Sequence, residues 1–492
     1  MEGSRWARAS VPSNPIRLCR REDCLMIRRL RELVVVAAFA AATVSLGQSY
    51  EDGLTGATRD YGQSLDLLDP ISAANGAYHF DLPLLSLGGP MDLNLVLHYR
   101  SDMERVGQQL PGTFWWGPFA KAVTGFTNGG HSYASVELPD ARQIAFLQKT
   151  NEYAWTLTGP TVDLGYIVYT DNVPRVRYQL EGTSNSLYLA DPAAQRLYVF
   201  AQAGIMGAQT NWRVAYIMDR NSNTLAYTYT SGRPSRVADG LGRSIDFSYL
   251  GTLTGAVDQV GRKLTFSYSF GGGAPDNGGQ TTLRAVSNTL GQGVTFWYGG
   301  LVVSHVNLVS SNSRPRGNVP LRRGYVGQTL YGESAARVSW EMDAYSNRTT
   351  VAYTAGNGQV RVGEPGGITS TLFHASSHGY PRSLTDPDGR TVQFSRDTNG
   401  HLTAVADRMG AQTAFAYDPA SGLPAAVTNA AGDSLQFTWT PRPQMFLNPG
   451  TADVVTVTFS DLTRVDYPDG TFETWAHDGR GNETSWTDRA GS

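Results

Sequence analysis

Few side chains in this sequence have the spacing that catalysis or metal binding needs. His374 and His378 lie four residues apart, but the segment around them has strand or loop character. On a strand this spacing separates the two side chains by about 13 Å, too far for both to bind one zinc ion. We therefore predict no metal site at these histidines.

Two acidic segments have the composition of ion-binding loops. Asp219-Arg-Asn-Ser-Asn-Thr carries oxygen-bearing side chains at alternate positions, but it lacks the glycine and the distal glutamate of a calcium loop. Asp386-Pro-Asp-Gly is typical of a tight turn.

The sequence contains neither a Gly-x-Ser-x-Gly nucleophile elbow nor a Gly-x-x-x-x-Gly-Lys phosphate loop. The sequence alone does not test whether a Ser-His-Asp site is assembled from residues far apart in the chain. Since no catalytic or cofactor motif is found, we predict a protein that is not an enzyme and holds no cofactor.

The composition excludes two further classes of protein. The 492 residues include 40 basic and 43 acidic side chains, with a formal net charge of −3. They also include 24 tyrosines, 18 phenylalanines and 10 tryptophans, which is unlike the composition of a disordered chain. The near-neutral charge lacks the basic excess of a nucleic-acid-binding protein, so we predict no nucleic-acid partner.

The amino-terminal segment predicts export. Residues 26–47 contain a short basic stretch, an apolar run and small residues at the end, which is the pattern of a secretory signal peptide. We predict cleavage between Gly47 and Gln48. The apolar run is shorter than the ~20 residues that a membrane-spanning helix needs, so the mature chain is expected to have no transmembrane segment. Residues 1–25 are interpreted as an upstream extension that is not native.

The exported chain is expected to contain no cysteine, because Cys19 and Cys24 both precede the cleavage site. Disulfides, thiol catalysis and thiolate metal sites are then excluded. Repeated sheet and buried aromatic rings must stabilise the fold instead. The expected location is the medium or the cell surface, with the periplasm as a further candidate.

A repeat of about twenty residues is the strongest pattern. Asp239 opens Asp-Gly-Leu-Gly-Arg-Ser-Ile-Asp-Phe-Ser-Tyr, and nineteen residues later Asp258 opens Asp-Gln-Val-Gly-Arg-Lys-Leu-Thr-Phe-Ser-Tyr. The first position is Asp or Asn, the fourth is Gly or Ser, and the ninth and eleventh are mostly aromatic. The eight copies begin at Asp219, Asp239, Asp258, Asn288, Asp343, Asp386, Asp407 and Asn429.

The first and fourth positions of each copy predict a tight turn. An Asp or Asn side chain accepts hydrogen bonds from nearby backbone amides, and Gly takes positive φ without steric cost. The turn residues singled out on this basis are Asp239, Gly242, Asp258, Gly261, Asp386, Gly389, Asp407 and Gly410.

After each turn, apolar and polar residues alternate. Ile245, Phe247 and Tyr249 fall on one face, which predicts a half-buried strand. A second short strand precedes the next turn, so each copy is a β-hairpin. The predicted fold is all-β, a long antiparallel sheet of repeated hairpins that follows an amino-terminal β region.

Two stretches interrupt the array. Residues 271–279 are rich in glycine and are interpreted as a flexible loop. Ser310 to Gly327 contains four arginines, among them Arg322 and Arg323, and is interpreted as a long basic connection with solvated charges. Binding of an acidic partner is the alternative for this stretch.

The repeat resembles the YD-repeat family, also called the Rhs repeat, of bacterial Rhs proteins, insecticidal toxin-complex C components and the animal teneurins. Tyr417-Asp418 is the namesake pair, and the resemblance extends over about residues 185–492. Upstream, Asp81-Leu-Pro-Leu-Leu is similar to the segment that precedes the repeats in bacterial members. The resemblance implies a spiral sheet that winds into a hollow shell, which encloses a carboxy-terminal cargo in toxin members. The family's self-cleaving core and toxin tail are not found before Ser492, so the sequence is expected to be either a fragment or a short, open shell.

The predicted organisation has four parts: residues 1–25, the extension; 26–47, the signal peptide; 48–200, an amino-terminal β region; and 201–492, the repeat array. The predicted function is an exported, non-enzymatic scaffold, part of a shell that encapsulates or presents a carboxy-terminal effector. Its partners would be that effector or other shell segments. The alternative is a cell-surface adhesion or glycan-binding protein, for which Trp115 and Trp116 are the candidate binding residues because they break the repeat's period.

Overall fold

The computed structural model describes part of the chain, and all described residues belong to the second of two units, Met1–Leu46 and Gly47–Ser492. The described ranges are 66–68, 71–72, 78–101, 113–117, 119–128, 131–139, 143–148, 154–157, 178–183, 185–192, 194–207, 209–270, 281–300, 307–312, 321–330, 333–354, 359–364, 369–375, 380–397, 401–419 and 421–491. These residues form β-strands and no helix, so the predicted all-β fold is confirmed. Among them, no helix is available that could span a membrane.

The first five strands form two small sheets that are separate from the repeats. They are β1 (Asp66–Leu68), β2 (Ile71–Ser72), β3 (His79–Ser86), β4 (Asn94–Arg100) and β5 (Thr113–Gly117). β1 pairs with β2, and β3, β4 and β5 form an antiparallel sheet in that order.

The next eight strands lead into the repeats. They are β6 (Lys121–Asn128), β7 (His131–Glu137), β8 (Gln143–Gln148), β9 (Ala154–Leu157), β10 (Gln179–Gly182), β11 (Ser186–Asp191), β12 (Arg196–Met206) and β13 (Gln209–Asp219). Each pairs antiparallel with the next. β13 is long enough to pair with β6 through its first half and with β14 through its second half.

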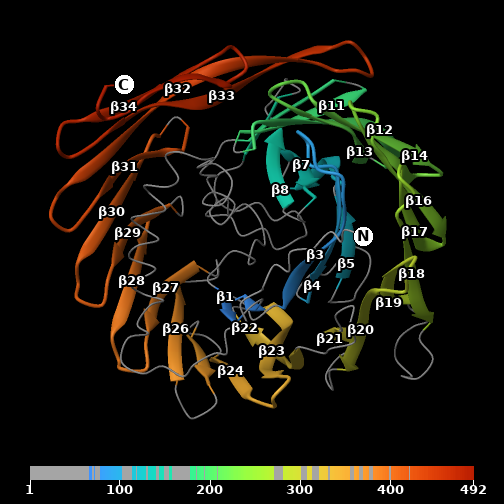
Figure 1. Ribbon diagram of the computed structural model, residues 1–492, viewed down its shortest axis with the longest axis horizontal. Coiled ribbons are helices and arrows are strands. Elements are labelled where there is room, and N and C mark those ends of the chain that lie inside the picture. Colours follow the sequence, from blue (N-terminus) through green and yellow to red (C-terminus); the bar gives the residue numbers. More distant parts are fainter. Residues whose placement is uncertain are drawn as a thin grey trace, which may run out of the picture. The chain divides into compact units, whose positions relative to one another are not determined.

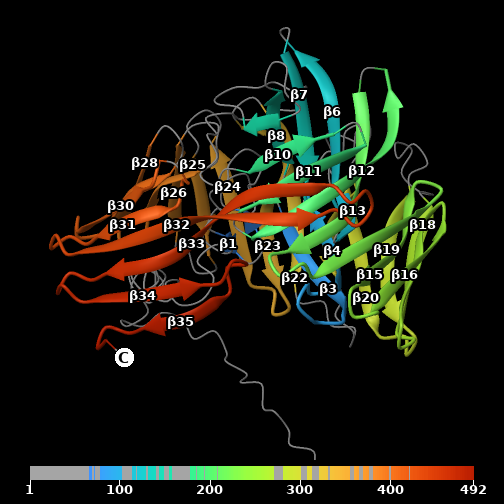
Figure 2. The ribbon, with the colours of Figure 1, turned by 90° about the horizontal axis from the view of Figure 1, so that it is seen from above.

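The repeats themselves form one continuous antiparallel sheet in which each strand pairs with the next (Figures 1 and 2). Its strands are β14 (Thr224–Thr230), β15 (Arg233–Asp239), β16 (Ser244–Leu250), β17 (Thr252–Asp258), β18 (Lys263–Phe270), β19 (Thr281–Asn288), β20 (Gly293–Gly300), β21 (Asn307–Asn312), β22 (Leu321–Leu330), β23 (Glu333–Asp343), β24 (Arg348–Thr354), β25 (Gln359–Gly363), β26 (Thr369–Ala375), β27 (Tyr380–Thr385), β28 (Thr391–Arg396), β29 (Leu402–Ala406), β30 (Gln412–Tyr417), β31 (Pro424–Thr428), β32 (Ser434–Leu447), β33 (Val454–Asp466), β34 (Phe472–His477) and β35 (Glu483–Thr487). The predicted succession of hairpins is confirmed.

A β-bulge recurs at the eleventh position of the repeat. The register shifts between Thr228 and Tyr229 in β14 and between Ser248 and Tyr249 in β16, because the return strand has one extra residue opposite this step. The same shift occurs in the hairpins that begin at β18, β20, β22, β26, β28, β30, β32 and β34. A bulge bends a strand and increases its twist, so its repetition gives the sheet a regular bend.

The main core lies between the repeat sheet and the chain's own amino-terminal strands. Rings at the ninth repeat position, such as Phe247 and Phe296, share one apolar cluster with Leu95 and Leu97 of β4. Phe80 of β3 stacks on Phe296 with ring centroids 5.9 Å apart. Figure 1 shows β3 to β5 beside β16 to β20. We call the ring-bearing side of the repeat sheet its inner face; over its first half it is covered by β3 to β5.

The described parts of the stretch predicted as a basic connection are strand, and their charge is not all solvated. β21 extends to Asn312 and β22 begins at Leu321. Arg323 is only 4% exposed, because it pairs with Glu341 on β23 and lies over the ring of Tyr78. The interpretation of this arginine as a solvated loop charge is therefore wrong. Residues 271–279 lie outside the described part of the chain.

Candidate functional site

The most regular chemical feature is the turn that opens each repeat. At Asp239, Oδ1 accepts hydrogen bonds from the backbone amides of Leu241 and Arg243, both at 2.9 Å. The amide of Gly242 donates to the Asp239 carbonyl oxygen at 3.2 Å. One carboxylate thus satisfies the backbone donors that the turn leaves free. The same pattern of contacts is found at Asp258, Asn288, Asp343, Asp407, Asn429 and Asp478.

The fourth turn position has positive φ whatever residue occupies it. Gly242 has φ of 79°, and Ser346, which replaces glycine in one copy, has φ of 69°. An L side chain in this region is strained by about 1 kcal/mol or more. This conformation explains why glycine recurs at the fourth position in the sequence.

We predict opposite effects of two substitutions at this position. Ser346→Gly relieves the strain and should raise the free energy of unfolding by up to about 1 kcal/mol, whereas Gly410→Ala should lower it by about 1 kcal/mol or more. A Cβ on Gly410 would meet no atom within 4 Å, so backbone strain alone is tested there. Equilibrium urea unfolding measures both values, and a loss of stability in Ser346→Gly would contradict the account.

The turn carboxylates also make the stability depend on pH. Hydrogen bonds from Asn482, its side chain first and then its backbone amide, lower the pKa of Asp478 to about 2. The side chain of Asn347 likewise lowers the pKa of Asp343. An unfolded aspartate titrates near pH 3.9, so the folded state binds fewer protons than the unfolded state in this range. The stabilisation is complete above the unfolded pKa and is lost as pH falls through the folded pKa.

Replacing Asp343 and Asp478 by asparagine should therefore reduce the acid sensitivity of the fold. Asn288 and Asn429 already occupy the first position in two copies and make the same backbone contacts. We expect the variant to lose less stability than the unaltered protein between about pH 4 and pH 2. Urea unfolding at a series of pH values measures this difference, and parallel curves would contradict the assignment.

The fifth turn position connects the repeats to the amino-terminal sheet. Arg243 binds the Asp239 carboxylate and also donates to the carbonyl oxygens of Leu87, at 2.5 Å, and Gly88, at 2.9 Å. Gly89 packs so closely on this guanidinium that an added Cβ would lie 1.8 Å from Nη2. In the next repeat Arg262 donates to the carbonyl oxygen of Ser86 at 3.0 Å. The turns thus hold the β3–β4 connection in place.

In several copies the eleventh-position ring links its repeat to the one before. The hydroxyl of Tyr229 donates to the carbonyl oxygen of Val214, fifteen residues earlier, at 2.7 Å. Equivalent bonds join Tyr298 to Leu283, Tyr353 to Val338, Tyr417 to Leu402 and, through the indole nitrogen, Trp439 to Pro424. Burial raises the pKa of Tyr229, as it does for Tyr249, whose pKa rises to about 12. The Tyr229 hydroxyl is therefore a neutral hydrogen-bond donor in the fold, which is a structural role.

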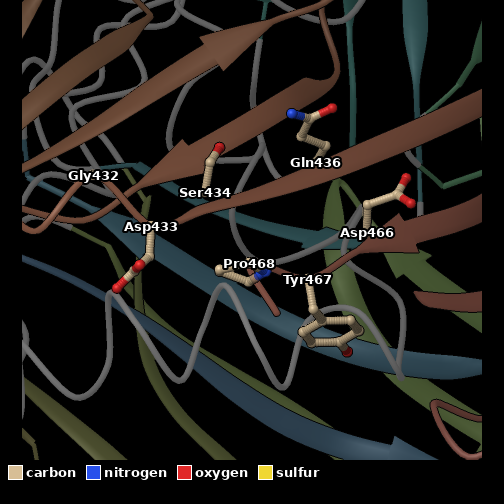
Figure 3. A pocket seen from close by; sticks show the side chains of 7 residues that line it. All are labelled: Gly432, Asp433, Ser434, Gln436, Asp466, Tyr467 and Pro468. Atoms are coloured by element: carbon tan, nitrogen blue, oxygen red, sulfur yellow. The ribbon is translucent and has the colours of Figure 1, made fainter. Parts of the chain in front are cut away.

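One open hollow lies beside the turns that precede β32 and β34. Its volume is about 520 Å³, and it is lined by Gly432, Asp433, Ser434, Gln436, Asp466, Tyr467 and Pro468. In Figure 3 the side chains of Asp433 and Tyr467 point away from those of Ser434 and Gln436, so the polar groups do not converge. Asp466 is paired with Arg464, and the Tyr467 hydroxyl donates to Glu473 at 3.0 Å. A ligand site needs convergent polar groups, and this hollow lacks them.

Most of the other sequence candidates lie outside the described part of the structure. Trp115 and Trp116 lie on β5, opposite His98 and Leu97 of β4, and their side chains are outside the described part. Gly47 and Gln48 are also outside it, as is His378, while His374 lies on β26. No group of three or more His, Cys, Asp or Glu side chains within the described ranges is placed to hold a metal ion. Gly389 and Gly410 have positive φ, and Asp386 and Asp407 accept the amides of these glycines.

Comparison with known proteins identifies the repeat. The family model of the RHS repeat matches residues 396–434, which extend from the end of β28 to the start of β32. These residues are an RHS repeat. The resemblance to the YD-repeat, or RHS-repeat, family is thereby confirmed. No curated protein matches the sequence.

Solved structures that contain toxin-complex proteins are also similar. A Photorhabdus luminescens Tc holotoxin pore with a mutation in TccC3 matches with a TM-score of 0.34 and 11% identity, over 83% of this chain and 25% of that chain. A TcdB2-TccC3-Cdc42 structure matches with a TM-score of 0.33 and 10% identity, over 85% of this chain and 28% of that chain. TcdB2-TccC3 without its hypervariable carboxy-terminal region matches with a TM-score of 0.34 and 10% identity, over 81% and 26%. The chain spans about a quarter of the length of these solved chains.

Proposed function

We propose that this RHS-repeat chain is an exported, non-enzymatic scaffold that encloses or presents a polypeptide effector. The observation that carries the proposal is the return of the repeat sheet to its own beginning. Asn482, in the turn before β35, exchanges hydrogen bonds of 2.8 and 3.0 Å with Asn221, in the turn before β14. A sheet that bends round to this extent has an inner face on which a polypeptide can be held apart from solvent.

The inner face is not equally accessible to an enclosed polypeptide along the whole repeat sheet. Phe247, Phe266 and Phe296 are at most 8% exposed, because the amino-terminal strands pack over them. Phe394 and Phe415, at the same repeat position in later strands, are only partly buried. We therefore assign the face of β28 to β31 as the part that would contact an enclosed polypeptide.

A protease-protection experiment tests the enclosing role. A short peptide with a specific protease site is joined after Ser492, and in a matched control the same peptide precedes Gln48. We expect the carboxy-terminal site to be cut at least about ten times more slowly than the amino-terminal one. Equal rates of cutting would contradict enclosure.

Export is tested independently by the mature amino terminus. Expression of the full chain in a bacterial host should give a product that begins at Gln48, found outside the cytoplasm. Replacing Gly47 by aspartate should block the cut, since a small residue is needed before it. An uncut chain that stays in the cytoplasm would contradict the export proposal and leave the protection experiment unaffected.

A second candidate is a surface protein that binds glycans through exposed rings. Tyr345 is 87% and Trp486 48% exposed, which is more than packing within the sheet requires. A glycan array tests it, and a Trp115→Ala, Trp116→Ala variant and a Tyr345→Ala, Trp486→Ala variant are the comparisons. Binding that is lost in either variant would favour this candidate, and no binding to any glycan would count against it.

A further inference from the structure

The hairpin β32–β33 is much longer than its neighbours. β32 has 14 residues and β33 has 13, whereas β31 has 5 and β34 has 6. β31 pairs only with Ser434 to Gln436, and β34 only with Arg464 to Asp466. The distal part of this hairpin, which we call the arm (residues 440–461), therefore has no neighbouring strand on either side within the described chain.

One face of the arm packs on the outer side of β11 to β13. Phe446 and Phe459 of the arm are 1% and 0% exposed, and they share an apolar cluster with Tyr188, Ala190 and Val199. All six residues of β11 are buried, because the main core covers one of its faces and the arm covers the other. Figure 2 shows β32 and β33 crossing this region. We call this contact the seam.

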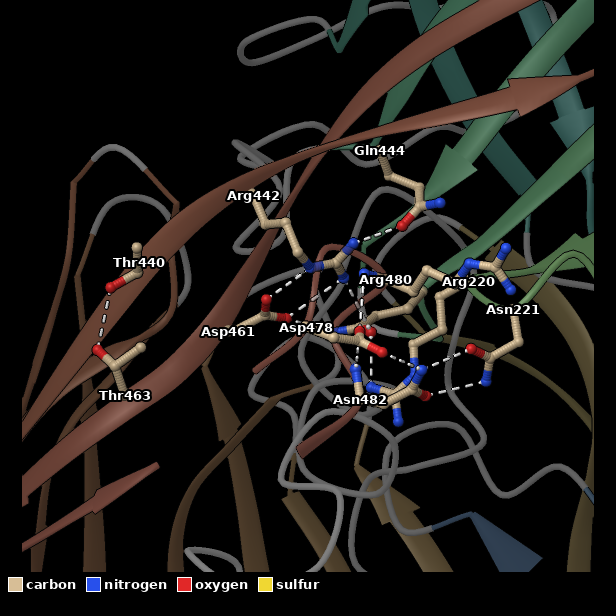
Figure 4. Close-up of polar contacts among 11 residues, drawn as sticks. Arg220, Asn221, Thr440, Arg442, Gln444, Asp461, Thr463, Asp478, Arg480 and Asn482 are labelled. Atoms are coloured by element: carbon tan, nitrogen blue, oxygen red, sulfur yellow. Dashed lines mark hydrogen bonds and ion pairs between the residues drawn. The ribbon is translucent and has the colours of Figure 1, made fainter. Parts of the chain in front are cut away.

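A buried ion pair lies at the base of the seam. Nε of Arg442 lies 2.6 Å from Oδ2 of Asp461, and the two side chains are 9% and 6% exposed. Arg442 also donates to Gln444 at 2.6 Å (Figure 4). Gln195, before β12, donates to Asp461 at 3.4 Å.

At the tip of the arm, two further hydrogen bonds reach β11. The hydroxyl of Tyr188 donates to Asp453 at 2.9 Å and accepts from Asn448 at 3.0 Å. The seam thus has an apolar centre with polar contacts at its ends, as protein interfaces do.

The seam differs from every other junction of the sheet. From β13 to β35 each strand is joined to the next by backbone hydrogen bonds. Across the seam the described contacts are made by side chains, such as Gln179 to the backbone of Thr458. Separating the arm from β11 therefore breaks no strand pairing, whereas separating any two neighbouring strands does.

We propose that the seam opens and closes while the repeat sheet stays folded. Local opening of this kind needs less free energy than unfolding, because only the interface is lost. In the closed state the arm holds the end of the repeat sheet against β11 to β13, which directly precede the repeats. This inference concerns the fold alone and does not depend on an enclosed effector.

Cysteine labelling tests the proposal in a chain whose Cys19 and Cys24 are replaced by serine. Ala190→Cys places a thiol in the seam and Ala256→Cys places one in the main core, and both alanines are 1% exposed. Under native conditions we expect the seam thiol to react with a thiol reagent at least about ten times faster than the core thiol. Equal rates would overturn the proposal.

A matched pair of arm variants separates seam opening from unfolding. Val457 faces the seam and is 3% exposed, whereas Val454, on the same strand, faces solvent and is 63% exposed. Val457→Asp should accelerate labelling at position 190 and leave labelling at position 256 unchanged, and Val454→Asp should change neither rate. If Val457→Asp accelerated both sites equally, the seam would be an inseparable part of the core and the proposal would be wrong.

Discussion

Phe296→Ala is expected to lower the free energy of unfolding by about 3–5 kcal/mol, the range found when a buried phenylalanine is removed from a well-packed core. Phe296 is 0% exposed and stacks on Phe80 of β3. The substitution removes a ring that belongs both to the repeat sheet and to the contact with the amino-terminal strands. Equilibrium urea unfolding, followed by tryptophan fluorescence, measures the loss.

Phe472→Ala is the matched control for this prediction. Phe472 also lies on a repeat strand, but it is 42% exposed. Its removal should cost no more than about 1 kcal/mol, because little apolar surface is uncovered. Equal costs at the two positions would show that the amino-terminal strands do not cover the inner face as described.

The second large effect is expected at the buried ion pair between β22 and β23. Nε of Arg323 lies 2.7 Å from Oε2 of Glu341, and these side chains are 2% and 10% exposed. The guanidinium also lies 3.8 Å from the ring centroid of Tyr78. Glu341→Gln leaves the positive charge buried without its partner and should cost about 3–5 kcal/mol.

A double substitution distinguishes the cost of the unpaired charge from a general disturbance. Replacing Arg323 by methionine together with Glu341→Leu removes both charges and should recover most of the loss. Arg322→Ala, at the exposed neighbouring position, should have an effect below about 0.5 kcal/mol. If the double variant were as unstable as Glu341→Gln, the loss would arise from packing rather than from charge.

The turns could be predicted from the sequence because their chemistry is local. Asp239 and Gly242 are three residues apart, and the carboxylate and the positive φ act within the same turn. The alternation after each turn likewise needs only neighbouring residues. A long hairpin sheet follows from these two signals, and the structure has it.

The contacts that join the repeat sheet to the amino-terminal strands and its last turns to its first could not be predicted, because they join residues far apart in the sequence. Arg243 binds Gly88, 155 residues away, and Asn221 binds Asn482, 261 residues away. The burial of Arg323 could not be predicted either, because Tyr78, whose ring it lies over, is far away in the sequence, and the pattern around Arg323 does not indicate its partner Glu341 on the next strand. The bulge leaves no such local signal, since it occurs at Arg396 as well as at rings such as Tyr417.

The repeat sheet bends until its last turns meet its first. The distance between spin labels at Leu241 and Arg480, both exposed in turns, tests it most directly. About twenty strand steps of ~4.8 Å separate these turns along the sheet, so a flat sheet would place them about 100 Å apart. The account predicts a main population with the labels within about 30 Å, since Asn482, in the turn of Arg480, is bonded to Asn221, in the turn one repeat before Leu241. A main population beyond the range of the measurement would contradict it.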